Sequence, residues 1–291
     1  MPLTTATAPR SCLCVPADDE RKTLRALSGP ADQVVLDLED AVPADRKDLA
    51  REGAVAAAAR APERDIVVRI NGLDTAWWRE DITAVVTRMP TVRGVVVPKS
   101  ERLDDLLALE RQLTALEDGT RRPVDVQLLI ESARGLSDVD TLLGGSARTT
   151  AVVIGYADLG VSLRRPVGPP AAATWLAVQH QVLLAARTHG VYAIDGPWFD
   201  FRDEVACSAA NAHAVASGFD AKWVIHPGQI DAVNAAFRPH EAAVRRARRM
   251  IEAFEGAAGA VVAVDGTMVD KPVVDAARLV LAAHDDTRNA R

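Results

Sequence analysis

With 291 residues, 48% hydrophobic and 25% charged, the chain has the composition of a soluble globular enzyme and a length suited to one α/β barrel. Its 34 Lys and Arg against 40 Asp and Glu give a formal net charge of −6, which argues against nucleic-acid binding because that function needs a basic patch. No apolar run is long enough for a membrane span and residues 1–10 lack a secretory apolar segment, so we expect a cytoplasmic protein.

Short apolar segments recur along the chain, each followed by a helix-like stretch. They are continuous rather than alternating, which is typical of strands buried on both faces of a parallel sheet. We expect eight strands, at Ser11–Val15, Gln33–Leu38, Ile66–Ile70, Gly94–Pro98, Val126–Ile130, Ala151–Ile154, Val191–Ile194 and Trp223–Ile225. The three cysteines, Cys12, Cys14 and Cys207, are too few for a disulfide framework, so we expect buried, reduced thiols.

The segments between the strands have helical spacing, most clearly at Ala44–Arg60, Arg102–Leu116, Ala171–Thr188 and Asp203–Ser217. Eight strand–helix units predict a (β/α)8 TIM barrel rather than an open doubly wound sheet. The first strand is also followed by Pro16-Ala17-Asp18-Asp19 instead of the glycine-rich phosphate loop that many open sheets carry.

The pattern changes after Pro239. A helix is predicted at His240–Phe254 and a small hairpin around Asp265-Gly266, a pair that favours primed turns. A last helix is predicted at Val273–Ala283. We therefore expect residues 1–238 to form the barrel and residues 239–291 to form a helix–hairpin–helix extension, which either packs on the barrel or reaches a neighbouring subunit.

Polar residues follow most of the predicted strands, where catalytic groups of such barrels lie. We expect them to converge on one opening: Glu39, Asp40, Arg69, Asn71, Lys99, Glu131, Asp158, Asp195 and His226. Carboxylates on adjacent strands, Glu131 and Asp158, suit Mg²⁺, which takes one or two carboxylates and keeps waters. The absence of HExxH, CxxC and clustered histidines argues against zinc. The alternative for any single carboxylate is that it caps a helix or pairs with an arginine.

Three other residues allow more than one role. Arg69 directly follows a buried strand, where an arginine is costly unless it is paired or functional, and this favours anion binding. Lys99 either neutralises buried carboxylates or touches a substrate. His226 precedes Pro227 and is interpreted as a structural residue of the last strand's loop rather than a general base.

Several motifs, taken together, resemble the citrate lyase beta-subunit-like and malyl-CoA lyase family of the 2-keto-acid aldolase superfamily. The resemblance extends from about residue 10 to 285 and is carried by Arg10-Ser11, Val15-Pro16, Leu36–Val42, Lys47, Arg51, Val68–Asn71, Val97–Lys99, Ile130–Gly135, Gly155–Leu159, Ile225–Ile230 and Gly266–Pro272. It implies a (β/α)8 barrel that forms a homotrimer or hexamer. The implied activity is cleavage or condensation of a 3-hydroxyacyl-CoA thioester, such as malyl-CoA, citramalyl-CoA or citryl-CoA, with an acyl-CoA and a 2-keto acid as the partners.

The resemblance also implies roles for individual residues. Mg²⁺ is expected on Glu131 and Asp158, with Arg69 on the reacting oxygen and Asp270 delivered into a neighbouring subunit's site as the acid or base. Glu39 and Asp40 are expected to hold metal waters. The residues expected to contact the substrate are Gly155, Tyr156, Ala157 and Lys99. Those expected to contact the CoA phosphates are Arg21, Lys22 and Arg25.

One departure from the family pattern bears on substrate identity. Many relatives carry Glu-Asp where this chain has Ala157-Asp158, so the metal ligand is kept while a carboxylate beside the keto-acid pocket is lost. Two alternatives remain. A Mg²⁺-dependent aldolase of free 2-keto-4-hydroxy acids is disfavoured by the Asp270 segment. A non-catalytic scaffold subunit is disfavoured because Glu131, Asp158, Arg69 and Asp270 are all present.

Overall fold

The computed structural model describes residues 8–119, 122–166, 168 and 172–289. The chain divides into two compact units, one ending at Asn234 and the other beginning at Ala235. Each is described by itself below.

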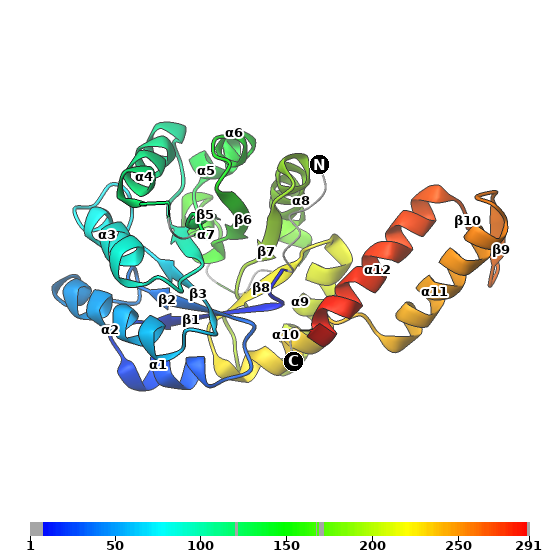
Figure 1. The fold of residues 1–291 in the computed structure, drawn as a ribbon, viewed down its shortest axis with the longest axis horizontal. Coiled ribbons are helices and arrows are strands. Elements are labelled where there is room, and N and C mark those ends of the chain that lie inside the picture. The colour runs from blue at the N-terminus through cyan, green and yellow to red at the C-terminus, as the bar shows by residue number, and fades with distance from the viewer. Residues whose placement is uncertain (1–7, 120–121, 167, 169–171, 290–291) are drawn as a thin grey trace. The chain divides into compact units, whose positions relative to one another are not determined.

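The first unit is a closed barrel of eight parallel strands in sequence order, with β1 pairing β8 (Figure 1). The strands are β1 Ser11–Pro16, β2 Gln33–Asp37, β3 Asp65–Arg69, β4 Gly94–Val97, β5 Asp125–Ile130, β6 Thr149–Ile154, β7 Tyr192–Asp195 and β8 Ala221–Val224. The prediction of a (β/α)8 barrel is therefore confirmed. β6 and β8 begin two residues earlier than expected, because polar residues such as Lys222 lie within them.

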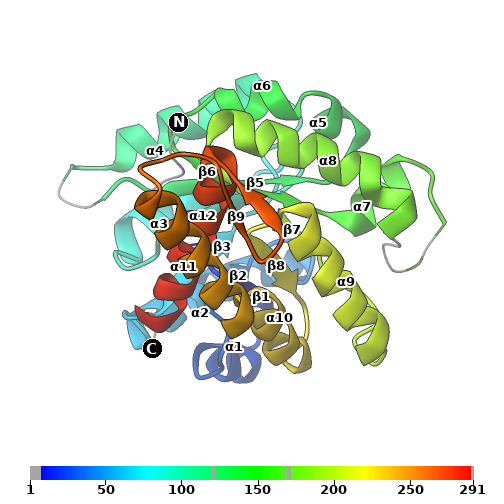
Figure 2. The same cartoon turned by 90° about the vertical axis from the view of Figure 1, so that its right-hand side faces the viewer.

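Helices alternate with the strands and surround the barrel (Figure 2). They are α1 Glu20–Leu27, α2 Lys47–Arg60, α3 Trp78–Arg88, α4 Leu103–Leu116, α5 Ala133–Ser137, α6 Val139–Gly144, α7 Tyr156–Ser162, α8 Ala172–His189, α9 Glu204–Ser217 and α10 Ile230–Ala236, with 3-10 turns at Ala44–Arg46 and Pro227–Gln229. Gly218 ends α9 in the left-handed conformation, with φ 100°. No helix within the described ranges is both long and apolar enough to cross a membrane.

The barrel interior is filled by buried side chains from all eight strands: Cys12, Val35, Val67, Val96, Leu129, Ala151, Val153, Ile194, Ala221 and Trp223. Cys14 packs against this cluster, and burial raises its pKa to about 12. Burial also raises the pKa of Cys12 and of Cys207, and all three thiols are free. The prediction of reduced, largely buried cysteines holds.

The second unit pairs two helices, α11 Glu241–Gly256 and α12 Lys271–Asn289, through a hairpin of β9 Val262–Val264 and β10 Thr267–Val269. Its small core contains Ala247, Met250, Val269, Val274 and Ala277. Asp265 and Gly266 have φ of 49° and 73°, as a primed hairpin turn requires. The expected helix–hairpin–helix arrangement is present.

Candidate active site

An arginine and an aspartate from neighbouring strands form the base of the site. Asp37 ends β2 and Arg69 ends β3, and the two residues are partners in the strand register. Arg69 Nε and Nη2 donate to the two carboxylate oxygens of Asp37 at 2.7 and 2.6 Å. Burial opposes the charged guanidinium, yet Asp37 and Glu39 raise the pKa of Arg69 well above its usual value. Arg69 is therefore a fixed, permanent cation.

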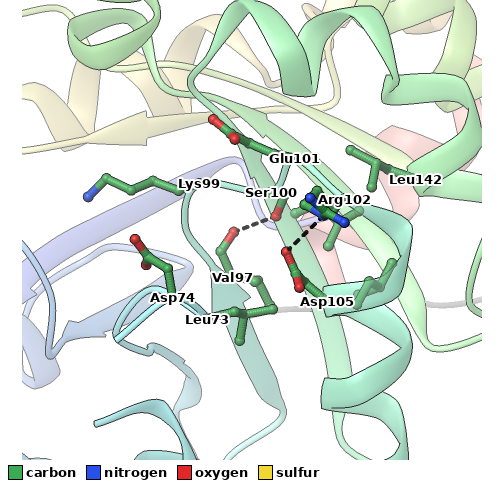
Figure 3. A pocket seen from close by; sticks show the side chains of 11 residues that line it. Leu73, Asp74, Val97, Lys99, Ser100, Glu101, Arg102, Asp105 and Leu142 are labelled. Atoms are coloured by element: carbon green, nitrogen blue, oxygen red, sulfur yellow. Dashed lines mark hydrogen bonds and ion pairs between the residues drawn. The ribbon is translucent and has the colours of Figure 1, made fainter. Parts of the chain in front are cut away.

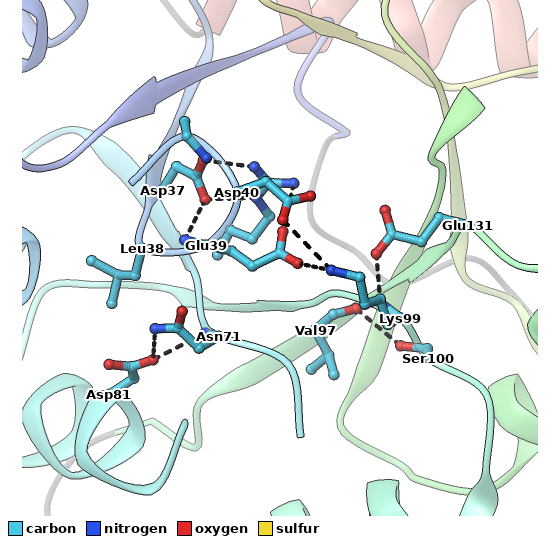
Figure 4. Close-up of polar contacts among 12 residues, drawn as sticks. Asp37, Leu38, Glu39, Asp40, Asn71, Asp81, Val97, Lys99, Ser100 and Glu131 are labelled. Carbon is cyan, nitrogen blue, oxygen red and sulfur yellow. Dashed lines mark hydrogen bonds and ion pairs between the residues drawn. The ribbon is translucent and has the colours of Figure 1, made fainter. Parts of the chain in front are cut away.

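Glu39 lies between two cations. Arg69 Nη1 is 3.0 Å from Glu39 Oε2. Lys99 Nζ is 2.6 Å from Glu39 Oε1 (Figure 4). Lys99 Nζ is also 3.6 Å from the more exposed Asp40. Burial raises the pKa of Glu39 despite both cations. Of the two roles expected for Lys99, these contacts fit the neutralisation of buried carboxylates.

The backbone of Lys99 holds a second carboxylate. Its φ of 47° is a left-handed conformation that non-glycine residues adopt rarely. In this conformation the main-chain N–H donates to Glu131 Oε1 at 2.6 Å, while the side chain turns to Glu39. Figure 4 shows both bonds of Lys99. One strained residue thus connects the carboxylates that follow β2 and β5.

Glu131 is a buried carboxylate with an excess of negative charge around it. Burial, Glu39 and Asp158 raise its pKa to about 8, against the opposing effects of the Lys99 N–H and Arg69. Gly155 lies directly against it: a Cβ at that position would be 2.6 Å from Glu131 Cβ and 2.9 Å from Oε2. A glycine is therefore needed for Glu131 to keep its position.

Asp158 is exposed on the first turn of α7 and is close enough to Glu131 to raise the pKa of that carboxyl. Oxygen donors with surplus negative charge are what Mg²⁺ prefers, and it retains waters beside one or two carboxylates. Among the described residues, no group of three or more His, Cys, Asp or Glu side chains forms a metal cage. The two carboxylates fit an open, partly hydrated Mg²⁺ site.

Some residues expected at this opening point elsewhere. Asp195 follows Ile194, which faces the barrel interior, so Asp195 lies on the helix side of β7 and pairs there with Lys222. The Tyr156 side chain is also buried, and its hydroxyl donates to Asp195 Oδ1 at 2.5 Å. Only the backbone of Tyr156 is then available to a substrate. Ala157, next along α7, is exposed.

The loop after β8 is organised around His226. Its Nδ1 accepts the Gly228 N–H at 3.1 Å, and its ring stacks on Phe201 with centroids 4.6 Å apart. Gln229 Oε1 accepts the His226 N–H at 3.2 Å, which completes a capping box. These bonds agree with the structural role expected for His226.

The remaining expected residues make local contacts of their own. Arg21, Lys22 and Arg25 are exposed on α1, and Lys22 pairs with Asp19 at 3.2 Å. In the second unit, Asp270 Oδ1 accepts the Val273 N–H at 3.2 Å, so Asp270 caps α12 with one oxygen.

Two cations on α2 support the site and were not assigned roles from the sequence. Lys47 Nζ donates to the main-chain oxygens of Leu38 and Glu39, both at 2.8 Å. Arg51 Nε donates to Asp81, which accepts two bonds from Asn71. The signal was their spacing of four residues, which places both on one helix face.

A cavity of about 230 Å³ lies beside Lys99, between the loops after β3 and β4 (Figure 3). Its apolar lining includes Leu73, Val97, Leu106, Leu128 and Leu142. Figure 3 shows the Lys99 side chain extending away from Ser100 and Arg102 on the cavity's rim. Lys99 therefore belongs both to the lining of this cavity and to the carboxylate cluster.

Comparison with known proteins identifies the family of the chain. The sequence profile of the HpcH/HpaI aldolase/citrate lyase family matches residues 10–227. The chain belongs to this family. It is 35% identical over 281 residues to the citrate lyase subunit beta of Escherichia coli K12, covering 94% of this chain and 92% of that protein. It is 30% identical to the L-malyl-CoA/beta-methylmalyl-CoA lyase of Rhodobacter capsulatus, covering 86% of each.

A solved structure supports the same assignment. CitE from Mycobacterium tuberculosis, in complex with magnesium, acetoacetate and coenzyme A, has a TM-score of 0.77 and 31% identity, covering 96% of this chain and 99% of that one. As a member of the HpcH/HpaI aldolase/citrate lyase family with lyases as relatives, the chain is a carbon–carbon lyase.

Proposed function

We propose that this lyase is Mg²⁺-dependent and cleaves, or in reverse forms, a 3-hydroxyacyl-CoA thioester of the malyl-CoA, citramalyl-CoA or citryl-CoA type. The products of cleavage are an acyl-CoA and a 2-keto acid. The observation that carries the proposal is that Glu131, which follows β5, and Asp158, which follows β6, lie close enough for Asp158 to raise the pKa of Glu131. With its pKa near 8, Glu131 is a buried acid that a neighbouring cation would stabilise as a carboxylate.

The chemistry expected of bound Mg²⁺ is Lewis-acid polarisation of the keto-acid oxygen. Glu39 and Asp40 would hold waters bound to the metal. Main-chain N–H groups at Tyr156 and Ala157 would face the acid's carboxylate. The Gly155 N–H, expected beside them, instead donates to the Ile130 main-chain oxygen at 2.9 Å. Many relatives have a glutamate at the position of Ala157. Because alanine is uncharged, this part of the site would accept an anionic group without the repulsion that a glutamate would add.

Arg69 would stabilise negative charge as the carbon–carbon bond breaks. Cleavage removes the proton of the 3-hydroxyl, forms the keto-acid carbonyl and leaves a thioester enolate, which must be protonated. A guanidinium fixed by Asp37 can stabilise that enolate without rearranging. Arg69→Lys keeps a charge but loses the fork, so we expect the loss to appear mainly in kcat.

The proton transfer is assigned to Asp270 of a neighbouring subunit in a homotrimer or hexamer. Only Oδ1 forms the helix cap, which leaves Oδ2 for this role. CoA phosphates would be bound by Arg21, Lys22 and Arg25, exposed cations on the first helix after the barrel's first strand. Both assignments extend the family resemblance to residues of this chain.

The proposal is tested by incubating the purified protein and Mg²⁺ with a panel of 3-hydroxyacyl-CoA thioesters and of free 4-hydroxy-2-keto acids. We expect release of a 2-keto acid from a thioester, and its loss in Glu131→Gln and Asp158→Asn proteins that fold normally. Cleavage of the free acids alone would indicate a CoA-independent aldolase. Inactivity on the whole panel with no Mg²⁺ binding would contradict the proposal.

A further inference from the structure

A buried polar chain connects three consecutive barrel units on the helix side of the strands. Asp195 ends β7, and Lys222 is its register partner on β8. The two form an ion pair in which both side chains are almost fully buried, with exposures of 4% and 2%. Tyr156 donates its hydroxyl to the other Asp195 oxygen at 2.5 Å and accepts from Gln179 Nε2 at 2.7 Å.

Such a chain is expensive as a packing element. Burying two charges costs free energy that their attraction barely offsets, and apolar replacements are often as stable. The pair also faces away from the opening, so neither residue can touch a substrate there. The buried ion pair is therefore better explained by a role in holding another part of the protein in place than by a contribution to stability.

That group is the start of α7. Tyr156 is the first residue of this helix, and Asp158 lies in the same turn. The Tyr156 ring is enclosed: a Cβ on Gly196 would lie 2.5 Å from it, and Trp175 meets its face edge-on at a centroid distance of 4.8 Å. Gly155, on the other side, rests against Glu131.

The turn between β6 and α7 is thus fixed from two directions. Glu131 limits it on the opening side, and Tyr156 anchors it to β7 and β8 on the helix side. The distance between Glu131 and Asp158 depends on this turn, because one carboxylate follows β5 and the other is carried by α7.

We propose that Asp195 and Lys222 are positioning residues that act through the Tyr156 hydroxyl to hold Asp158 in register with Glu131 for metal binding. This inference rests on the proposed function. Groups that orient metal ligands from outside typically change metal affinity by about 10–100-fold when they are removed.

The test compares two tyrosine-to-phenylalanine variants. Tyr156→Phe removes the hydroxyl that meets Asp195, whereas Tyr192→Phe makes the same change at the opposite end of β7. Mg²⁺ affinity is measured by isothermal titration calorimetry, with folding checked by circular dichroism. We expect Tyr156→Phe to weaken Mg²⁺ binding by about tenfold and to lower kcat, and Tyr192→Phe to change neither.

A second pair of variants separates position from charge. Lys222→Met leaves Asp195 unpaired and is expected to weaken Mg²⁺ binding further, or to unfold the barrel. The Asp195→Asn, Lys222→Met double variant removes both charges but keeps an oxygen for Tyr156, so we expect it to bind Mg²⁺ more tightly than Lys222→Met and more weakly than the parent protein. Parent-like Mg²⁺ affinity in this folded double variant would contradict the positioning role of the ion pair.

The outcomes distinguish this inference from the proposed function. If the parent protein binds Mg²⁺, Glu131→Gln abolishes that binding, and folded Tyr156→Phe binds as tightly as the parent, the positioning role is wrong while the metal site stands. If Glu131→Gln binds Mg²⁺ as the parent does, the proposed metal site is wrong, and the positioning role fails with it.

Discussion

Lys99 and Glu131 are joined through the main chain: the Lys99 N–H lies 2.6 Å from Glu131 Oε1 because Lys99 has a left-handed φ of 47°. A carboxylate after β5 is therefore held by the backbone after β4. This contact does not need the Lys99 side chain, which is engaged with Glu39, so the two functions of the residue can be separated by mutation.

Substitution of Lys99 by glycine should be less harmful than substitution by alanine. Both remove the ammonium, but glycine adopts a positive φ without strain, whereas alanine does not. We expect the free energy of unfolding in urea to be about 1 kcal/mol higher for Lys99→Gly than for Lys99→Ala. At most positions the alanine variant is the more stable of the two. An alanine variant at least as stable as the glycine variant would show that the backbone strain at this position is unimportant.

Gly155→Ala should damage the metal site. Its Cβ would lie 2.6 Å from Glu131 Cβ, so Glu131 or the start of α7 must move. We expect at least a tenfold loss of Mg²⁺ affinity by calorimetry, roughly the effect of losing a group that orients a ligand. Gly160→Ala in the same helix is the control, because its nearest neighbour there would be Trp175 at 3.8 Å. Equal Mg²⁺ affinity in the two variants would count against this packing argument.

Glu131→Gln should stabilise the metal-free protein at alkaline pH. Burial and nearby carboxylates raise the pKa of Glu131 to about 8, above its value in the unfolded chain, so the folded state keeps this proton longer. The protonated Glu131 side chain therefore contributes fully to stability below the pKa of 4.5 that it has when unperturbed, and this contribution is lost as pH rises from there through about 8.

The measurement is thermal or urea unfolding in EDTA from pH 5 to 9. In the parent protein the free energy of unfolding should decline as pH rises, and we expect this decline to be smaller in Glu131→Gln. Above pH 8 the free energy of unfolding of the variant should exceed that of the parent by on the order of 2 kcal/mol. Added Mg²⁺ should then stabilise the parent protein but not the variant. A parent protein whose metal-free stability does not fall over this range would contradict the assigned environment of Glu131.

Asp270 is best tested by subunit complementation. Asp270→Asn and Glu131→Gln proteins should each be inactive, because each lacks one residue of every site. If sites combine residues from two subunits, random exchange at equal amounts would unite the intact pair in about a quarter of them. Activity assays before and after verified exchange provide the measurement. No recovery would mean that Asp270 serves its own subunit or only the cap of α12.

The barrel was predictable because its strands are apolar on both faces, and the carboxyl ends of such strands converge. Arg69, Glu39, Lys99 and Glu131 were found by that rule. Asp195 was wrongly expected to join them. Side chains alternate between the inside and the outside of a barrel, so a polar residue at a strand end faces the opening only if its position has the right parity, which an unbroken apolar run does not reveal.

The supporting contacts were less accessible to sequence reasoning. Lys222 is buried in a strand, although a charged residue in a sequence usually indicates an exposed position. Its ion-pair partner, Asp195, is 27 residues earlier in the chain. Lys47 and Arg51 lie in an alanine-rich helix that would suit a solvated surface equally well. Lys47 binds main-chain oxygens of the loop that precedes its own helix, whereas Arg51 and Lys222 bind carboxylates of other strand–helix units. The apolar and polar pattern of the sequence shows none of these contacts.

The three free thiols have a practical consequence for spectroscopic labelling. With a pKa near 12, Cys14 is almost entirely protonated at neutral pH, and the raised pKa values of Cys12 and Cys207 work in the same direction. Maleimides and iodoacetamides react with thiolates, so the native cysteines should compete poorly with one introduced on the surface. A fluorophore pair on the two compact units could therefore be attached without first replacing any cysteine, and would report the distance between the two units.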